Sequence, residues 1–248
     1  MPFLERDGAS LYYEDIGAGY PLLLLAPGSW QASIYHWHEP AESPFDPFVE
    51  LASEYRLIAL DERHAGRSRA PLSAQDGWHT YTADHVALLD HLGIEKAHVM
   101  GSCIGVSFAL ALIEAQPWRV SAAILAKPIG MWPGRDREGC LKNFDERTRG
   151  WLGEATGAGP EVLDAFRDGV YMNDFVYSVT RDFVRRCDTP MMVFPGDDVS
   201  HPRVIAEEIG RLAVNAELIA DWRRPEALAV AVRRAHAFLK EHTPAVGG

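Results

Sequence analysis

The stretch GSCIG at residues 101–105 decides the fold of this chain. It follows a short apolar segment at 98–100 and precedes a run of small and apolar residues at 106–115, which indicate a buried strand and a helix. Glycines two positions before and after Cys103 indicate a strained turn, because a side chain at either glycine would collide with the neighbouring strand or helix. The stretch therefore predicts a strand, a sharp turn with Cys103 at its apex, and a helix.

Strand and helix patterns alternate on both sides of this turn. Short apolar runs bounded by turn residues predict strands, and apolar residues three or four positions apart predict helices. The predicted strands lie at 22–26, 57–60, 98–100, 120–126, 191–194 and 217–220, after an opening hairpin at 2–17, and the predicted helices lie at 46–54, 81–92, 106–115, 205–212 and 225–240. This alternation is typical of an α/β fold with a mainly parallel central sheet and helices on both faces, which binds ligands at the carboxyl ends of its strands.

One long segment breaks the alternation. Residues 128–187 are rich in glycine, arginine and aromatic residues, and contain patterns for two short helices near 160–168 and 173–185. We predict that this segment is a small cap inserted over the ligand site. The remaining residues, 1–127 and 188–248, then form the core of a single α/β unit.

Composition narrows the class of protein. Hydrophobic residues make up 47% of the 248 residues and charged residues 24%, which is ordinary for a globular domain. The formal net charge of -11 opposes binding to nucleic acid or to anionic membrane surfaces. Neither a signal-like start nor a membrane-length apolar stretch is visible, so we expect a cytoplasmic protein. Three scattered cysteines predict free thiols rather than disulfides or a metal site, and the sequence leaves open whether the chain forms a homo-oligomer.

Two motifs carry a resemblance to a known family. GSCIG at 101–105 fits the pattern glycine-x-nucleophile-x-glycine between a strand and a helix, and DERHAGRS at 61–68 follows a predicted strand as D-x-R-x-x-G-x-S. On these motifs the chain resembles the α/β-hydrolase superfamily over its whole length. Most members have serine at the apex, and Cys103 resembles the cysteine of dienelactone hydrolase-like members. A thiolate is a competent nucleophile that a helix N-terminus stabilises; the alternative is a structural thiol in an inactive turn.

The resemblance also implies backbone amides that would stabilise an oxyanion. One should come from Ile104, directly after the nucleophile, and another from the loop after the strand at 22–26. Pro27 has no amide to donate, so Gly28 or Ser29 is the expected second donor. The alternative for this loop is a plain turn.

The positions of the acid and the base depart from the pattern that is usual in this family. The acid should follow the strand at 191–194, where we prefer Asp198 and regard Asp197 as a solvated neighbour. The family's histidine normally follows the last strand, but residues 216–225 contain none. The best replacement is His201, which precedes Pro202 and should cap the next helix. There the helix end would keep its ring neutral, and Asp198 would set its tautomer. The alternative is that both residues only cap the helix.

Other residues are candidates for the wall of the site. His36 lies in the loop after the first buried strand, and Trp132 and Tyr171 are two of the aromatic residues of residues 128–187. These three are the predicted substrate-binding residues, and the aromatic lining favours a small, largely apolar substrate. Glu39 is too isolated beside His36 to predict a metal site.

Together these residues predict a cofactor-independent hydrolase. Cys103 would attack an ester, thioester, lactone or related carbonyl to form an acyl-enzyme, with His201 as the base and Asp198 as its partner. Fold alone does not fix the reaction, so an acyltransferase or a lyase on the same fold is an alternative. A non-catalytic protein that binds or senses a small molecule is another, supported by the missing histidine.

Overall fold

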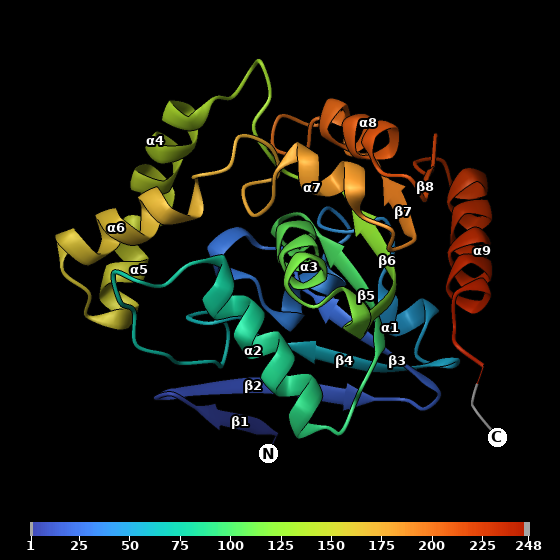
Figure 1. Ribbon diagram of the computed structural model, residues 1–248, viewed down its shortest axis with the longest axis horizontal. Helices are drawn as coiled ribbons and strands as arrows, with labels where there is room; N and C mark the ends of the chain where they lie inside the picture. The colour runs from blue at the N-terminus through green and yellow to red at the C-terminus, as the bar shows by residue number, and fades with distance from the viewer. Residues whose placement is uncertain (1, 246–248) are drawn as a thin grey trace.

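The computed structural model describes residues 2–245 and has a central sheet flanked by helices (Figure 1). Within these residues the sheet has eight strands, in the order β1-β2-β4-β3-β5-β6-β7-β8. The strands are β1 (Phe3–Arg6), β2 (Ala9–Ile16), β3 (Tyr20–Leu25), β4 (Tyr55–Leu60), β5 (Ala97–Ser102), β6 (Val120–Ala126), β7 (Met191–Phe194) and β8 (Ala216–Leu218). The pairs that involve β2 are antiparallel and the others are parallel, which confirms the predicted hairpin and the mainly parallel sheet.

The helices follow the strands in the order that an α/β fold requires. In Figure 1, α2 and α3 lie in front of the sheet, and α9 lies beyond β8 at the right. The α-helices are α1 (Pro47–Glu50), α2 (Trp78–His91), α3 (Ile104–Ala115), α4 (Arg137–Arg147), α5 (Arg149–Thr156), α6 (Pro160–Val170), α7 (Arg181–Arg186), α8 (Arg203–Leu212) and α9 (Pro225–Glu241), with 3-10 turns at Ser29–Gln31, Ile34–His38 and Pro117–Arg119. None of the helices in the described part of the chain has the length and apolar character needed to cross a membrane.

The central strands are apolar because helices and loops cover both of their faces. Leu22 to Leu25 of β3 are all fully buried, as are Ala122 to Ala126 of β6. Successive residues of a strand point to opposite faces, so unbroken burial requires cover on both sides. The short apolar runs in the sequence therefore identified the centre of the sheet.

The segment between β6 and β7 is more helical than the sequence predicted. We call residues 128–187 the cap segment, and its α4, α5 and α6 group at the left of Figure 1. The predicted helix at 160–168 is present as α6, but α4 and α5 were missed because their buried side chains are too few to form an apolar stripe. Only the end of the helix predicted at 173–185 is present, as α7, because residues 171–180 form turns and bends in which Tyr177 has a φ of 68°. The limits of the cap segment as a structural unit stay a prediction.

Two glycines hold α3 against the sheet. A Cβ at Gly105 would lie 2.0 Å from the carbonyl oxygen of Leu25 in β3, and a Cβ at Gly101 would lie 2.2 Å from the carbonyl oxygen of Gly105. Neither approach leaves space for a methyl group beside rigid backbone. The reason inferred from the sequence for these two glycines is therefore confirmed.

This packing predicts the effect of a single added methyl group. We expect Gly105→Ala to lower the free energy of unfolding by about 2 kcal/mol or more, because an overpacked core must shift its backbone. Gly150→Ala is the matched control, since Gly150 lies in α5 with no atom within 4 Å of the added Cβ, and alanine favours a helix. Urea unfolding of both variants makes the comparison; equal stabilities would contradict the proposed contact.

Candidate active site

Cys103 lies at the apex of the turn between β5 and α3. Its φ and ψ are 55° and -118°, a region that non-glycine residues rarely adopt and that costs of order 1–3 kcal/mol. The amide of Cys103 donates a hydrogen bond of 3.0 Å to the carbonyl oxygen of Ala126, at the end of β6. The surrounding strands therefore hold the thiol at the carboxyl edge of the sheet, where it is buried but lines a cavity.

Asp198 and His201 lie on one loop, between β7 and α8. Nδ1 of His201 is 2.9 Å from both carboxylate oxygens of Asp198, and the amides of Ser200 and His201 also donate to that carboxylate at 2.9 Å. The loop is tight, since a Cβ at Gly196 would lie 2.2 Å from the carbonyl oxygen of His201. Asp198 thus fixes the orientation of the imidazole, and Nε2 of His201 is buried without a hydrogen-bond partner in residues 2–245.

Two details of His201 differ from the sequence-based prediction. Pro202, with an extended ψ of 131°, is the N-cap of α8, and the helix begins at Arg203, so His201 precedes the cap. Burial lowers the pKa of His201, but its interaction with the Cys103 thiol raises it, Asp198 adds to this, and the net pKa lies above the usual value of 6.5. The direction of this pKa shift is opposite to the effect expected of the helix end, because the Cys103 thiol and the Asp198 carboxylate favour the charged ring.

Lys127 is a polar neighbour that the sequence analysis missed. It follows β6 directly, its Nζ is 3.7 Å from Oδ2 of Asp198, and Nζ also donates to the carbonyl oxygen of Ala41. Burial alone would raise the pKa of Asp198, but the His201 contacts and the charge of Lys127 lower it to about 2. A polar residue at the carboxyl end of a buried strand is a signal that could have identified Lys127.

The loop between β8 and α9 contacts the loop that carries Asp198 and His201. Trp222 Nε1 donates to the carbonyl oxygen of Pro195 at 2.9 Å, and Arg223 forms a 2.5 Å ion pair with Asp197. Asp198 contacts His201, whereas Asp197 is the more exposed, ion-paired neighbour. The loop after β8, where the family's histidine was expected, therefore binds and supports the β7–α8 loop that carries His201.

Cys103 and His201 open into one cavity of about 620 Å³ between the sheet edge and the cap segment. Asp198 lies behind His201 and does not line it. The lining residues are Gly28, Ser29, Trp30, His36, Glu39, Glu42, Cys103, Ile104, Ile129, Arg135, Cys140, Asn143, Arg147, Tyr171, Tyr177, Val199, Ser200 and His201.

The cavity contains two of the three predicted substrate-binding residues. His36 and Tyr171 line it, and the Tyr171 hydroxyl accepts a 3.2 Å hydrogen bond from Trp30 Nε1. Trp132 does not line it, because a tight turn folds its ring over Gly134. The lining is also more polar than the aromatic residues of the cap segment predicted, since arginine, asparagine and glutamate side chains reach it.

The predicted oxyanion donors line the same cavity as Cys103. Ile104 is the first residue of α3, so its amide has no acceptor within the helix, and Gly28, Ser29 and Ile104 all line the cavity. Gly28 has a φ of 114°, and a Cβ there would lie 2.6 Å from Nδ1 of His36. Glycine at this position lets the loop pass close to His36, and both Gly28 and Ser29 stay candidates for the second donor.

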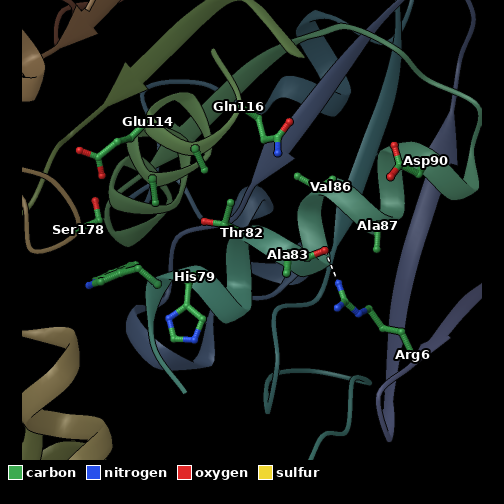
Figure 2. Close-up of a pocket in the computed structure, with 13 residues that line it drawn as sticks. Arg6, His79, Thr82, Ala83, Val86, Ala87, Asp90, Glu114, Gln116 and Ser178 are labelled. Atoms are coloured by element: carbon green, nitrogen blue, oxygen red, sulfur yellow. Dashed lines mark hydrogen bonds between the residues drawn. The ribbon is translucent and has the colours of Figure 1, made fainter. Parts of the chain in front are cut away.

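A second cavity, of about 540 Å³, lies between α2 and α3 (Figure 2). His79, Thr82 and Ser178 line it, but none of these three forms a hydrogen bond with another of them within residues 2–245. Neither Cys103 nor His201 lines this cavity. It lacks the paired nucleophile and base that make the first cavity the candidate active site.

Metal ligands do not cluster in the described part of the chain. No group of three or more histidine, cysteine, aspartate or glutamate side chains there is arranged to hold a metal ion. His36 instead contacts the Ser33 hydroxyl at 3.0 Å, and His38 contacts Asp46 at 2.7 Å.

Comparison with known proteins identifies the family. The α/β-hydrolase fold family matches residues 21–165, more than half of the chain, and the chain belongs to that family. A relative named "Putative carbamate hydrolase RutD", from Azorhizobium caulinodans, is 32% identical over 163 residues, or 65% of this chain and 54% of the relative. A 2-hydroxymuconate semialdehyde hydrolase from a Pseudomonas species is 32% identical over 118 residues, or 47% and 39%. These matches span about half of each relative's length or less.

Solved structures agree with the fold over the whole chain. MGS-M2, an alpha/beta hydrolase enzyme from a deep-sea metagenome library, matches with a TM-score of 0.71 and 16% identity, covering 100% of this chain and 99% of that one. At this identity the likeness shows the fold alone.

Asp198 should make part of the stability sensitive to acid. Its pKa in the folded chain is lowered to about 2, so its stabilising effect is complete above the unfolded value of about 4 and is lost as the pH falls through 2. We expect the stability difference between wild type and Asp198→Asn to shrink by about 1 kcal/mol between about pH 5 and 2, after allowance for solvent screening. Urea unfolding measures this, with Asp197→Asn as the control; a difference independent of pH would contradict it.

Proposed function

We propose that this chain is a cofactor-independent hydrolase that cleaves an ester, thioester, lactone or related carbonyl through an acyl-enzyme on Cys103. The observation that carries the proposal is one cavity lined by Cys103 and by a His201 whose Nδ1 is held by Asp198. A nucleophile, a base and an acid that orients the base form an arrangement that enzymes use for covalent acyl transfer. Both curated relatives are named as hydrolases, one of a carbamate and one of a semialdehyde.

Acylation is the first half of the proposed reaction. The Cys103 sulfur attacks the carbonyl carbon, and its proton goes to Nε2 of His201, which has no other partner in residues 2–245. The oxyanion that forms accepts hydrogen bonds from the Ile104 amide and from Gly28 or Ser29. Collapse breaks the bond to the leaving group, which takes the proton from His201 and departs as an alcohol, thiol or amine.

Water completes the cycle. Neutral His201 accepts a proton from a water molecule whose oxygen attacks the acyl carbon, and the second oxyanion uses the same amides. Its collapse breaks the carbon–sulfur bond, releases the carboxylic acid and returns the proton from His201 to Cys103. Asp198 and Lys127 keep the imidazole oriented through both halves, because Asp198 holds Nδ1 and Lys127 holds Asp198.

Intact-mass spectrometry after brief exposure to activated esters and thioesters tests the proposal. We expect the wild type to gain one acyl group transiently and Cys103→Ala to gain none. In His201→Gln we expect any adduct to form slowly and to persist, with turnover reduced by about 100-fold or more, the scale of general base catalysis. Cys140→Ala is the matched control, since Cys140 is a second buried thiol of the same cavity that contacts Tyr177 instead of a histidine.

The outcomes separate the alternatives. An adduct that persists in the wild type until an alcohol or thiol removes it would favour an acyltransferase. Turnover that survives Cys103→Ala would contradict the proposed nucleophile. No adduct and no turnover with any donor, together with ligand binding that is unaffected by Cys103→Ser, would contradict the enzyme and favour a binding protein.

A further inference from the structure

The cavity beside Cys103 contains two arginines that have no protein partner. Arg135 and Arg147 line it, and neither forms an ion pair or a side-chain hydrogen bond with any residue in the described range 2–245. Asn143 lies four positions before Arg147 on α4, lines the same cavity, and likewise has no side-chain hydrogen bond within that range. Residues four apart share one face of a helix, so α4 presents an amide and a guanidinium to the cavity.

The other arginines of the cap segment are engaged with acceptors. Arg149 and Arg167 pair with Asp145, and Arg137 donates to the carbonyl oxygen of Tyr171. Arg181, Arg185 and Arg186 are bound to Glu208 or to Asp182. Within this segment, the guanidinium groups left without a partner are the two that line the catalytic cavity.

The cavity also contains acidic side chains, from the loop after β3. Glu39 and Glu42 line it and form no ion pair within the described residues. Two glutamates and two arginines balance to no formal charge, but they come from different parts of the chain, one set from the core loop and the other from the cap segment. A ligand with one negative charge would gain by placing it at the arginines, and would lose by turning it toward the glutamates.

We propose that the substrate carries a carboxylate, and that Arg135, Arg147 and Asn143 bind this group while Cys103 attacks the carbonyl elsewhere in the molecule. A guanidinium presents a planar set of donors that matches the two oxygens of a carboxylate. A doubly charged phosphate would suit the arginines too, but Glu39 and Glu42 would repel its second charge. The substrate class is thus an ester, thioester or lactone that also carries one carboxylate. That the ester, thioester or lactone group is the one attacked rests on the proposed function.

Matched neutral and anionic ligands test this proposal without requiring turnover. Monomethyl succinate, glutarate and adipate each keep one methyl ester and one carboxylate, and their dimethyl esters keep the same length without the charge. Calorimetry with the Cys103→Ala chain measures binding alone. We expect at least one monoester to bind about 10-fold or more tightly than its dimethyl ester. This preference should be lost when the Cys103→Ala chain also carries Arg135→Gln or Arg147→Gln.

The controls separate a local contact from a general effect of charge or folding. Arg185→Gln removes a positive charge from exposed α7, outside the cavity, and should leave the preference intact. Removal of Arg135 or Arg147 leaves no carboxylate of residues 2–245 unpaired, so these variants should melt at the wild-type temperature. Inorganic phosphate is the third probe, and we expect it to compete poorly with the monoester.

Each outcome decides between the proposals. Equal binding of mono- and dimethyl esters throughout the series, or a preference that survives both arginine variants, would overturn the carboxylate site. Equal weakening of both esters would also overturn it, because the arginines would then only support the cavity. Phosphate that binds more tightly than every monoester would assign the site to a phosphate instead. A monoester that binds through the arginines but is never hydrolysed by the wild type would support this site and contradict the proposed function.

Discussion

The close approach of α3 to β3 is the constraint on which the rest of the site depends. Because Gly105 has no side chain, α3 begins directly against the backbone of Leu25, and the turn before it must hold Cys103 at a φ of 55°. This packing places the buried thiol at the edge of the sheet, where it lines the cavity, and leaves the first amide of the helix next to it in the chain. A longer side chain at Gly101 or Gly105 would separate the strand from the helix and displace both groups.

The second constraint is the compact loop after β7. Asp198 and His201 are three residues apart, so one turn of backbone supplies both the carboxylate and the imidazole of the proposed site. The β8–α9 loop supports the Asp198–His201 pair instead. Trp222 binds the backbone of the loop that carries this pair, and Arg223 binds the side chain of Asp197 in the same loop. The proposed base is therefore positioned by local hydrogen bonds, while the proposed nucleophile is positioned by packing across the sheet.

Much of this could be predicted from the sequence, because the strongest signals are local. The glycine spacing around Cys103 and the apolar runs of β3 to β7 follow from steric and burial rules that act within a few residues. Asp198 and His201 could be paired because they are neighbours in the chain. The direction of the His201 pKa shift could not be predicted, since it depends on Cys103, about a hundred positions away in the chain. Arg147 was also missed, because a polar helix such as α4 shows no stripe to indicate which face meets a cavity, and Arg135 was missed because it lies in the irregular turn before that helix.

Titration of the His201 ring by NMR shows whether His201 and Cys103 act as one unit. In the wild type we predict that His201 titrates above the ordinary histidine pKa of 6.5, because the Cys103 thiol offsets the effect of burial. In Cys103→Ala, burial should prevail and the pKa of His201 should fall. An unchanged His201 titration in that variant would contradict the account, because the ring would then be set by its own loop alone and the two residues would not form a catalytic pair.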